Sequence, residues 1–288
     1  MTTSIGAMPL LFVAIWATGF IVARLVAPHA DPLTFLSIRF ILSAAVFAGI
    51  AAIVRAAWPK GVRGWRDALM AGVLMQGIYL GGVFWSVRHG LPAGISALIT
   101  GLQPLLTAML AFPLLGERVG GRRWAGIGLG FAGALRVLQP QLRAGPDGVL
   151  LVPLLVCAAG MAGMTLGTIW QKRTASQSDV RSNAAVQFIG AALVTIPVAA
   201  LTEVGRFDGS WQAWTGLAWA VCALSISAIS LLMILIKRGA VVGVASLFYL
   251  VPPVVAVLAF ALFGEQLSLL QVAGMAVAAA GVALASRN

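Results

Sequence analysis

The chain has 288 residues and a formal net charge of +11, yet only 9% of its residues are charged and 60% are hydrophobic. Soluble domains carry about 25% charged residues, so most of this chain cannot face water and an integral membrane protein is predicted. Its two cysteines and two histidines, all in separate segments, exclude a disulfide framework and a Cys/His metal site, and they argue against hydrolysis by a histidine.

Ten apolar stretches follow one another along the chain, each about as long as the 20 residues that cross roughly 30 Å of hydrocarbon. They cover residues 7–26, 32–54, 67–87, 92–115, 123–138, 148–171, 183–202, 211–236, 240–263 and 268–286. The connections are short, so we expect an all-α polytopic membrane protein with ten transmembrane helices. The first stretch lacks a positively charged leader, and we expect it to be retained rather than cleaved as a signal peptide.

The sequence repeats itself at a shift of 148 residues. Thirteen of the thirty-two positions in 102–133 are identical to their counterparts in 250–281, among them Pro104 with Pro252, Gly116 with Gly264 and Glu117 with Glu265. This predicts a first five-helix repeat over residues 1–140 and a second over 148–288, joined by a loop at 141–147. Because five is odd, the second repeat must enter the membrane from the opposite side. Inverted repeats of this kind are typical of alternating-access transporters, whose substrate site lies between the halves.

Loop charges predict the orientation. When the connections are assigned alternately to the two sides, one side receives thirteen lysines and arginines and the other receives five, with Arg39 left inside a span. The positive-inside rule therefore predicts that both termini are cytoplasmic. The basic balance is a topology signal, and no nucleic-acid partner is expected.

Three motifs carry a resemblance to a known family. They are the segment Pro32–Phe40, which opens the second span, and the two copies of a proline followed about twelve residues later by Gly-Glu, at Pro104 and at Pro252. In this order and spacing the chain resembles the drug/metabolite transporter superfamily, more closely its EamA family, and it is similar to the YddG-type amino-acid exporters. The resemblance implies export of amino acids, aromatic ones included. The second half departs from the first where Gln187 stands opposite Arg39.

Polar side chains at helical spacing indicate which faces of the spans point into the bundle. Such stripes run along the third, fourth, sixth and ninth spans, while Trp16 and Phe248 would add aromatic walls and Met164 an adaptable apolar one. The expected substrate-binding residues are Trp16, Arg39, Gln76, Tyr79, Thr100, Gln103, Met164, Thr168, Phe248 and Tyr249. The alternative is that the polar groups only form hydrogen bonds between helices and that the methionine fills the core.

Charged groups inside the spans bear on the mechanism. Arg39 lies seven residues beyond Pro32, so it is either a counter-charge for a substrate carboxylate or a guanidinium that snorkels outward or binds free backbone carbonyls. Glu117 and Glu265 lie at helix ends, where capping or anchoring of loops competes with ion coupling. The other carboxylates lie in or beside loops. Without a carboxylate at the midplane, we expect facilitated transport rather than proton exchange.

The resulting expectation is a secondary transporter in a bacterial inner membrane, a multi-pass protein that exports amino acids or similar small metabolites. Its partners would be the small-molecule substrate and the lipid bilayer, a monomer is favoured, and no cofactor, metal ion or catalytic residue is expected. Drugs, sugars and other metabolites stay open as substrates, as does proton coupling. An intramembrane enzyme lacks a buried histidine and acid, and Ser96 stands in GISAL rather than GxSxG. A membrane scaffold would leave the polar stripes on several helices unexplained.

Overall fold

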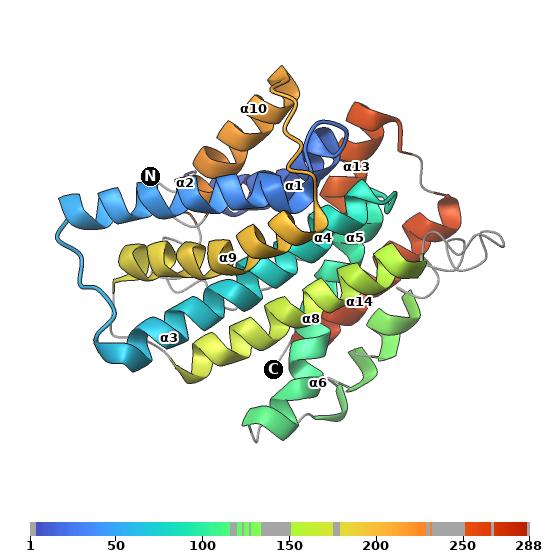
Figure 1. The fold of residues 1–288 in the computed structure, drawn as a ribbon. Coiled ribbons are helices and arrows are strands. Elements are labelled where there is room, and N and C mark those ends of the chain that lie inside the picture. Colours follow the sequence, from blue (N-terminus) through green and yellow to red (C-terminus); the bar gives the residue numbers. More distant parts are fainter. Residues whose placement is uncertain are drawn as a thin grey trace.

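The computed structural model describes residues 4–115, 120–122, 124–126, 128–133, 151–174, 179–228, 231, 251–265 and 268–286. Within these ranges the chain is helical, with one isolated antiparallel bridge between Ala30 and Phe207 and no strand (Figure 1). The helices are α1 (Ser4–Val26), α2 (Pro32–Ile53), α3 (Gly61–Gly72), η1 (Val73–Ile78), α4 (Tyr79–Arg88), α5 (Ala93–Gly101), α6 (Gln103–Leu115), α8 (Leu151–Arg173), α9 (Val180–Thr202), α10 (Trp211–Trp219), η2 (Ala220–Ser227), α13 (Val251–Phe263) and α14 (Leu269–Ser286).

Among the described residues, four helical segments are long and apolar enough to cross a membrane, namely Pro32–Ile53, Gly61–Arg88, Leu151–Gln171 and Val180–Thr202. Shorter apolar helices, among them Leu10–Val26 and Val251–Phe263, accompany them. Large apolar side chains such as Leu193, Ile196 and Phe260 are exposed on the outside of the bundle, where lipid would cover them. The expectation of an all-α, multi-pass membrane protein is confirmed at this level, while the count of ten spans stays a prediction.

Helix boundaries differ from the apolar stretches in two places. The third helix begins at Gly61 rather than at residue 67, because its first turns are amphipathic, with Arg63 and Arg66 outside the hydrophobic window. The fourth apolar stretch, residues 92–115, forms two helices, α5 and α6, with a turn at Leu102 between them. The helix is interrupted there because Pro104 has no backbone N–H to donate. Parts of the stretches predicted over 123–138, 211–236 and 240–263 lie outside the described residues.

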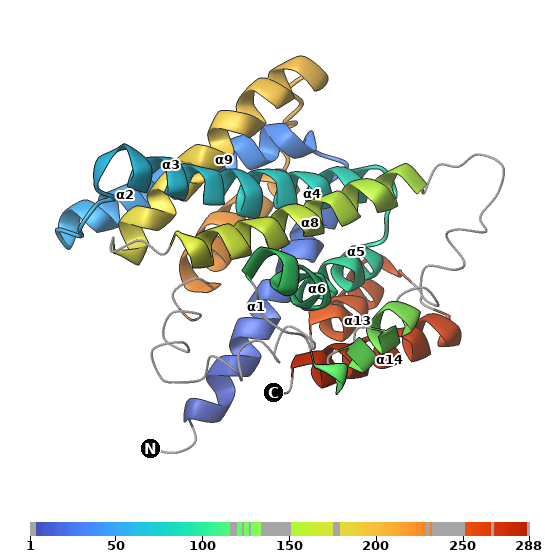
Figure 2. The ribbon, with the colours of Figure 1, turned by 90° about the horizontal axis from the view of Figure 1, so that it is seen from below.

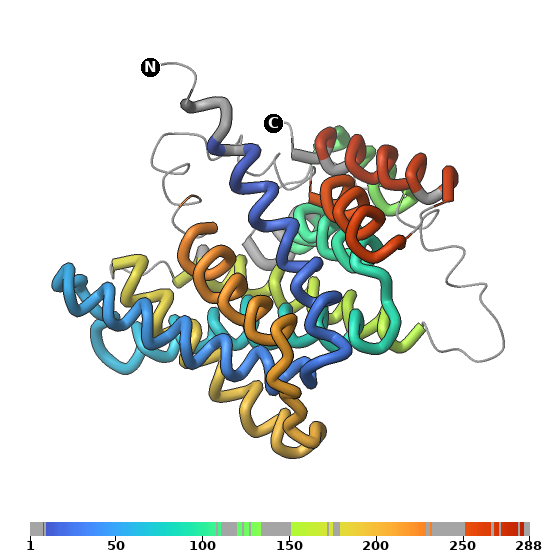
Figure 3. Tube along the Cα trace, turned by 90° about the horizontal axis from the view of Figure 1, so that it is seen from above, coloured from blue at the N-terminus to red at the C-terminus, as the bar shows by residue number. Residues whose placement is uncertain are grey.

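The two halves interleave rather than pack as separate blocks. Helix α9 of the second half packs against α2 and α3 of the first, and α8 packs against α4 and η1, so the four long segments form a row (Figures 1 and 2). Helix α1 lies against α13 and α10 from the second half (Figure 3). Any space at the centre of this arrangement is therefore bounded by both halves.

Residues at equivalent positions of the two repeats either contact each other or make equivalent contacts. Phe40 and its counterpart at the shift of 148, Phe188, pack with ring centroids 6.0 Å apart between α2 and α9. Asp31, the N-cap of α2, donates its backbone N–H to the Arg206 carbonyl over 2.9 Å. Its counterpart Asp179, the N-cap of α9, donates to the Ala57 carbonyl over 3.0 Å. Each of these two helices thus begins against the loop that follows the other.

In its described part, each half also contains a π-helical segment at the same place. The first is η1, residues 73–78, and the shift of 148 carries it to 221–226, inside η2. A π-helix is rare, and it widens the helix locally and changes the direction of the side chains that follow. A short insertion of this type is frequent at functional sites, which makes the space between η1 and η2 the first place to look for one.

Candidate functional site

A cavity of about 90 Å³ lies at the centre of the described helices. Trp16 and Gly19 of α1, Arg39 of α2 and Tyr79 of α4 line it together with Met164 of α8. The remaining lining residues are Phe20, Met75, Gln76, Leu80, Val83, Phe84, Phe188, Leu224 and Ser225. Both π-helical segments reach it, η1 through Met75 and Gln76 and η2 through Leu224 and Ser225. Mostly apolar walls with a few polar groups are typical of a small-molecule site.

Five of the residues expected from the sequence come together around this cavity: Trp16, Arg39, Gln76, Tyr79 and Met164. Thr100 and Gln103 line a smaller adjoining cavity of about 20 Å³, which shares Trp16, Tyr79 and Met164 with the larger one. Thr168 lies 3.5 Å from the Gln103 amide nitrogen, beyond that smaller cavity. Phe248 and Tyr249 lie outside the described residues.

Most hydroxyls of the predicted stripes bond within their own helix. Thr100 donates to the Ser96 carbonyl over 3.0 Å and Thr165 to the Met161 carbonyl over 3.0 Å. Ser86 donates to the Pro153 carbonyl over 2.7 Å, so it joins α4 to α8 away from the cavity. Serine and threonine hydroxyls inside helices commonly donate a hydrogen bond to a backbone carbonyl of the preceding turn. Their spacing marks buried faces without distinguishing packing from binding.

Gly19 and Ser225 belong to the cavity wall but were missed by the polar pattern. The signal for Gly19 was its place one turn after Trp16 in a run of small residues, which leaves room beside the indole. Ser225 has Gly77 as its repeat counterpart and stands in no polar stripe. Its direction depends on the π-helix, which nothing in the sequence pattern predicts.

Arg39 is the only charged residue among the described residues that line the cavity. It is 5% exposed, and its Nη2 donates to the Ser225 hydroxyl over a long 3.4 Å. Ser225 in turn accepts from Ser43 over 3.0 Å and donates to the Ala220 carbonyl over 3.1 Å. The Arg39 Nε has no hydrogen-bond partner among the described residues. A guanidinium with spare donors thus faces the cavity.

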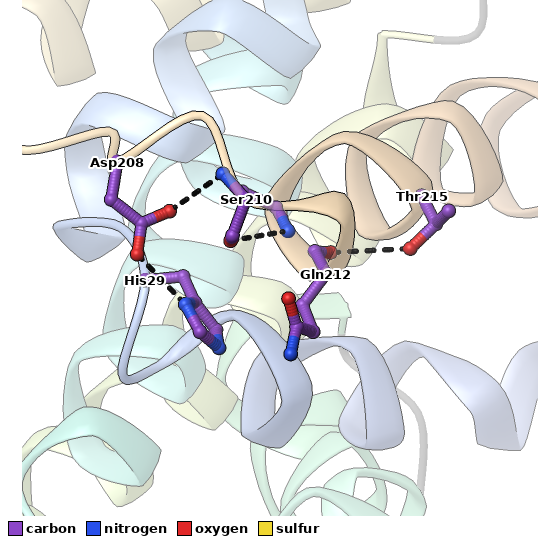
Figure 4. Close-up of polar contacts among 6 residues, drawn as sticks. His29, Asp208, Ser210, Gln212 and Thr215 are labelled. Atoms are coloured by element: carbon purple, nitrogen blue, oxygen red, sulfur yellow. Dashed lines mark hydrogen bonds and ion pairs between the residues drawn. The ribbon is translucent and has the colours of Figure 1, made fainter.

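The connections 27–31 and 203–210 meet at one end of the bundle, here called the Asp208 end (Figure 4). His29 Nδ1 lies 2.8 Å from the Asp208 carboxylate, and Asp208 also accepts the backbone N–H of Ser210 over 2.9 Å. The hydrogen bonds from Ser210, and then the one from His29, lower the pKa of Asp208 to about 2. This carboxylate therefore keeps its charge at neutral pH.

Two further carboxylates of the second half hold helix N-termini of the first half at the Asp208 end. Glu203 accepts the backbone N–H groups of Leu33 and Thr34, each over 2.8 Å. Glu265 accepts the backbone N–H of Ala93 over 3.1 Å and forms an ion pair with Arg24 at 3.2 Å. The sequence allowed either anchoring or ion coupling for Glu265. In the structure its carboxylate anchors the N-terminus of α5. Glu117 lies outside the described residues.

The apolar spans, the interleaved halves and the small cavity between them together define a polytopic membrane protein with an internal site. The EamA-like transporter family matches residues 4–139 and again 151–287. The chain belongs to this family, which makes it a membrane transporter of the drug/metabolite transporter superfamily and confirms the resemblance stated from the motifs.

Individual relatives are more distant. A probable amino-acid metabolite efflux pump of Escherichia coli is 27% identical over 178 residues, which cover 62% of this chain and 56% of that protein. The chain thus spans little more than half the length of that relative. The uncharacterized inner membrane transporter YedA of Escherichia coli is 24% identical over 266 residues, covering 91% of this chain and 84% of that one. A solved structure described only as "Crystal structure of protein" has a TM-score of 0.68 and 19% identity over 97% of this chain and 96% of its own, a likeness of fold alone.

Proposed function

We propose that the protein exports amino acids, aromatic and other neutral ones foremost, or similar small metabolites across a bacterial inner membrane. The observation that carries this proposal is the central cavity, which combines one cationic group, two hydrogen-bonding side chains and aromatic walls, contributed by Arg39, Gln76, Tyr79 and Trp16. These groups complement the carboxylate, the ammonium and the side chain of an amino acid. The efflux-pump relative supports the same direction and class of solute.

The proposed transport cycle is alternating access between two inverted five-helix repeats, residues 1–140 and 148–288, joined by 141–147. Two features support it: the mirrored N-cap contacts of Asp31 and Asp179, and the paired π-helical segments that face one cavity. In such a cycle one end of the bundle closes while the other opens. The carboxylates that bridge the halves at the Asp208 end would have to release their partners when that end opens.

The first expected result is counterflow without a proton gradient. Liposomes that contain the purified protein and unlabelled phenylalanine should accumulate labelled phenylalanine from outside. Collapsing an imposed pH difference should leave the initial rate nearly unchanged, because none of the described cavity residues changes charge between about pH 5 and pH 8. Protein-free liposomes are the control. If uptake requires the pH gradient, the mechanism is proton-coupled rather than facilitative. If none of the amino acids in a panel is taken up, the proposed substrate class is wrong.

The second expected result concerns topology, with both termini cytoplasmic. Lys60 is exposed in the loop before α3, and Val204, which is 92% exposed, lies at the Asp208 end. In a protein without its native cysteines, a membrane-impermeant maleimide added outside intact cells should modify Val204→Cys but spare Lys60→Cys until the membrane is permeabilised. If only Lys60→Cys were modified from outside, the protein would have the opposite orientation to the predicted one. If both cysteines were modified from outside, the two loops would lie on the same side, which would contradict the inverted repeat.

A further inference from the structure

We propose that Arg39 makes a carboxylate an obligatory part of the transported solute. The substrate class is then small zwitterions and monoanions that carry one carboxylate, while amines, esters and amides of the same shape are rejected. This inference rests on the proposed function and deepens it, because it assigns the chemistry that the cavity selects for rather than transport itself.

The first argument is that the described residues leave the guanidinium only partly satisfied. A guanidinium carries five N–H donors in a planar fork that fits two oxygens of one carboxylate. In Arg39 the Nε has no partner among the described residues, and the Nη2 makes a contact of 3.4 Å to Ser225. That contact is longer than a good hydrogen bond, and the Ser225 hydroxyl already accepts a shorter one from Ser43 over 3.0 Å. A bound carboxylate would supply the missing acceptors.

The second argument is that the described part of the chain supplies no counter-charge. No described carboxylate lies within ion-pair distance of Arg39. The carboxylates of Glu203 and Glu265 are held at the Asp208 end by backbone N–H groups of the first half. A charge buried in a membrane protein without a partner is costly, and such residues commonly face a solute pathway.

The third argument is that the two structural explanations for Arg39 do not fit the geometry. Snorkelling would place the head group in water or among lipid head groups, but the residue is only 5% exposed and lines an internal cavity. Binding to free carbonyls would require a backbone acceptor, and the one hydrogen bond described for Arg39 goes to a serine hydroxyl.

The rest of the cavity favours a single carboxylate with an uncharged remainder. The repeat counterpart of Arg39 is the neutral Gln187, so the duplication did not place a second cation opposite the first. Trp16 and the thioethers of Met75 and Met164 offer an aromatic face and adaptable apolar surface. An aromatic face also attracts an ammonium group. A dianion or a polyphosphate would find only one compensating charge among the described lining residues.

The test uses the unaltered protein first. Phenylalanine, its methyl ester and its amide have nearly the same shape, but only the free acid carries a carboxylate. In the counterflow assay, the acid should compete with labelled phenylalanine at least about tenfold better than the ester or the amide, the loss expected when charge-assisted hydrogen bonds are removed. The melting temperature of the protein in detergent should rise with the acid and not with the other two.

The variants assign the effect to Arg39. Arg39→Gln should remove the preference, so that acid, ester and amide compete equally, while Arg39→Lys should retain part of it because it keeps the charge without the fork. Arg206→Gln is the matched control, since Arg206 is exposed and its described hydrogen bonds use only its backbone. It should behave as the unaltered protein does.

The outcomes separate this proposal from the proposed function. If the unaltered protein transports phenylalanine but accepts the ester equally well, the carboxylate requirement is wrong and the exporter stands. If no amino acid is transported, the melting temperature still decides the matter: a rise with the acid alone that Arg39→Gln abolishes supports the carboxylate site, and equal shifts for all three compounds, or none, overturn it.

Discussion

Replacing Gly72 or Gly190 with alanine should lower the melting temperature of the purified protein by at least about 5 °C, given about 2–4 °C per kcal/mol for a large domain. These glycines mark the crossing of α3 and α9, where backbone touches backbone. A Cβ at Gly72 would overlap the Gln187 carbonyl, and one at Gly190 would overlap the Leu69 carbonyl. Neither neighbour is a side chain that can turn away, so the helices must separate and lose packing.

Gly49→Ala is the matched control for both substitutions. Gly49 lies inside α2, and no atom outside its own helix surroundings lies within 4 Å of the position of an added Cβ. Alanine favours a helix over glycine by about 1 kcal/mol, so this variant should melt at or above the temperature of the unaltered protein. Thermal unfolding in one detergent, followed by loss of monodisperse protein, compares the three. Equal melting temperatures would show that α3 and α9 are not in backbone contact.

Much of the helical arrangement could be predicted because the membrane imposes a simple rule. A segment that crosses hydrocarbon must satisfy its backbone internally, so apolar length translates directly into helix. The expected stretches 32–54 and 183–202 accordingly agree with α2 and α9 to within a few residues. The amphipathic start of α3 was not predicted, because it lies at the polar boundary of the membrane, where hydropathy no longer indicates helical structure.

The candidate site could be predicted only where its residues are conspicuous. Arg39 and Tyr79 stand out as large polar groups inside apolar stretches, and both line the cavity. Gly19 and Ser225 do not, since their contribution depends on where neighbouring helices and a π-helical turn place them. Gly19 and its repeat counterpart Gly167 illustrate the limit: the first borders the cavity, whereas a Cβ at the second would overlap Met75. A glycine at equivalent positions therefore leaves room for the cavity in the first half, and allows close helix packing in the second.

Filling the cavity from Gly19 should abolish transport while leaving the protein folded. A Cβ at this position would lie 3.7 Å from the nearest Leu224 carbon, an ordinary contact, so alanine is expected to be tolerated. The four carbons of leucine would extend into a space of about 90 Å³ and occupy the place of the solute. Gly19→Leu should thus show no counterflow at a near-normal melting temperature, and Gly49→Leu, on α2 away from the cavity, should transport normally.

Alkylation of Gly19→Cys, in a protein that lacks Cys157 and Cys222, tests most directly whether the central cavity is the transport site. A small thiol reagent should modify this cysteine, abolish phenylalanine counterflow once attached, and react several times more slowly when phenylalanine is present in excess. The same treatment of Gly49→Cys should leave transport unchanged. If the Gly19→Cys protein is fully modified and still transports at its original rate, or if phenylalanine leaves the rate of modification unchanged, the solute passes elsewhere and the cavity is not its site.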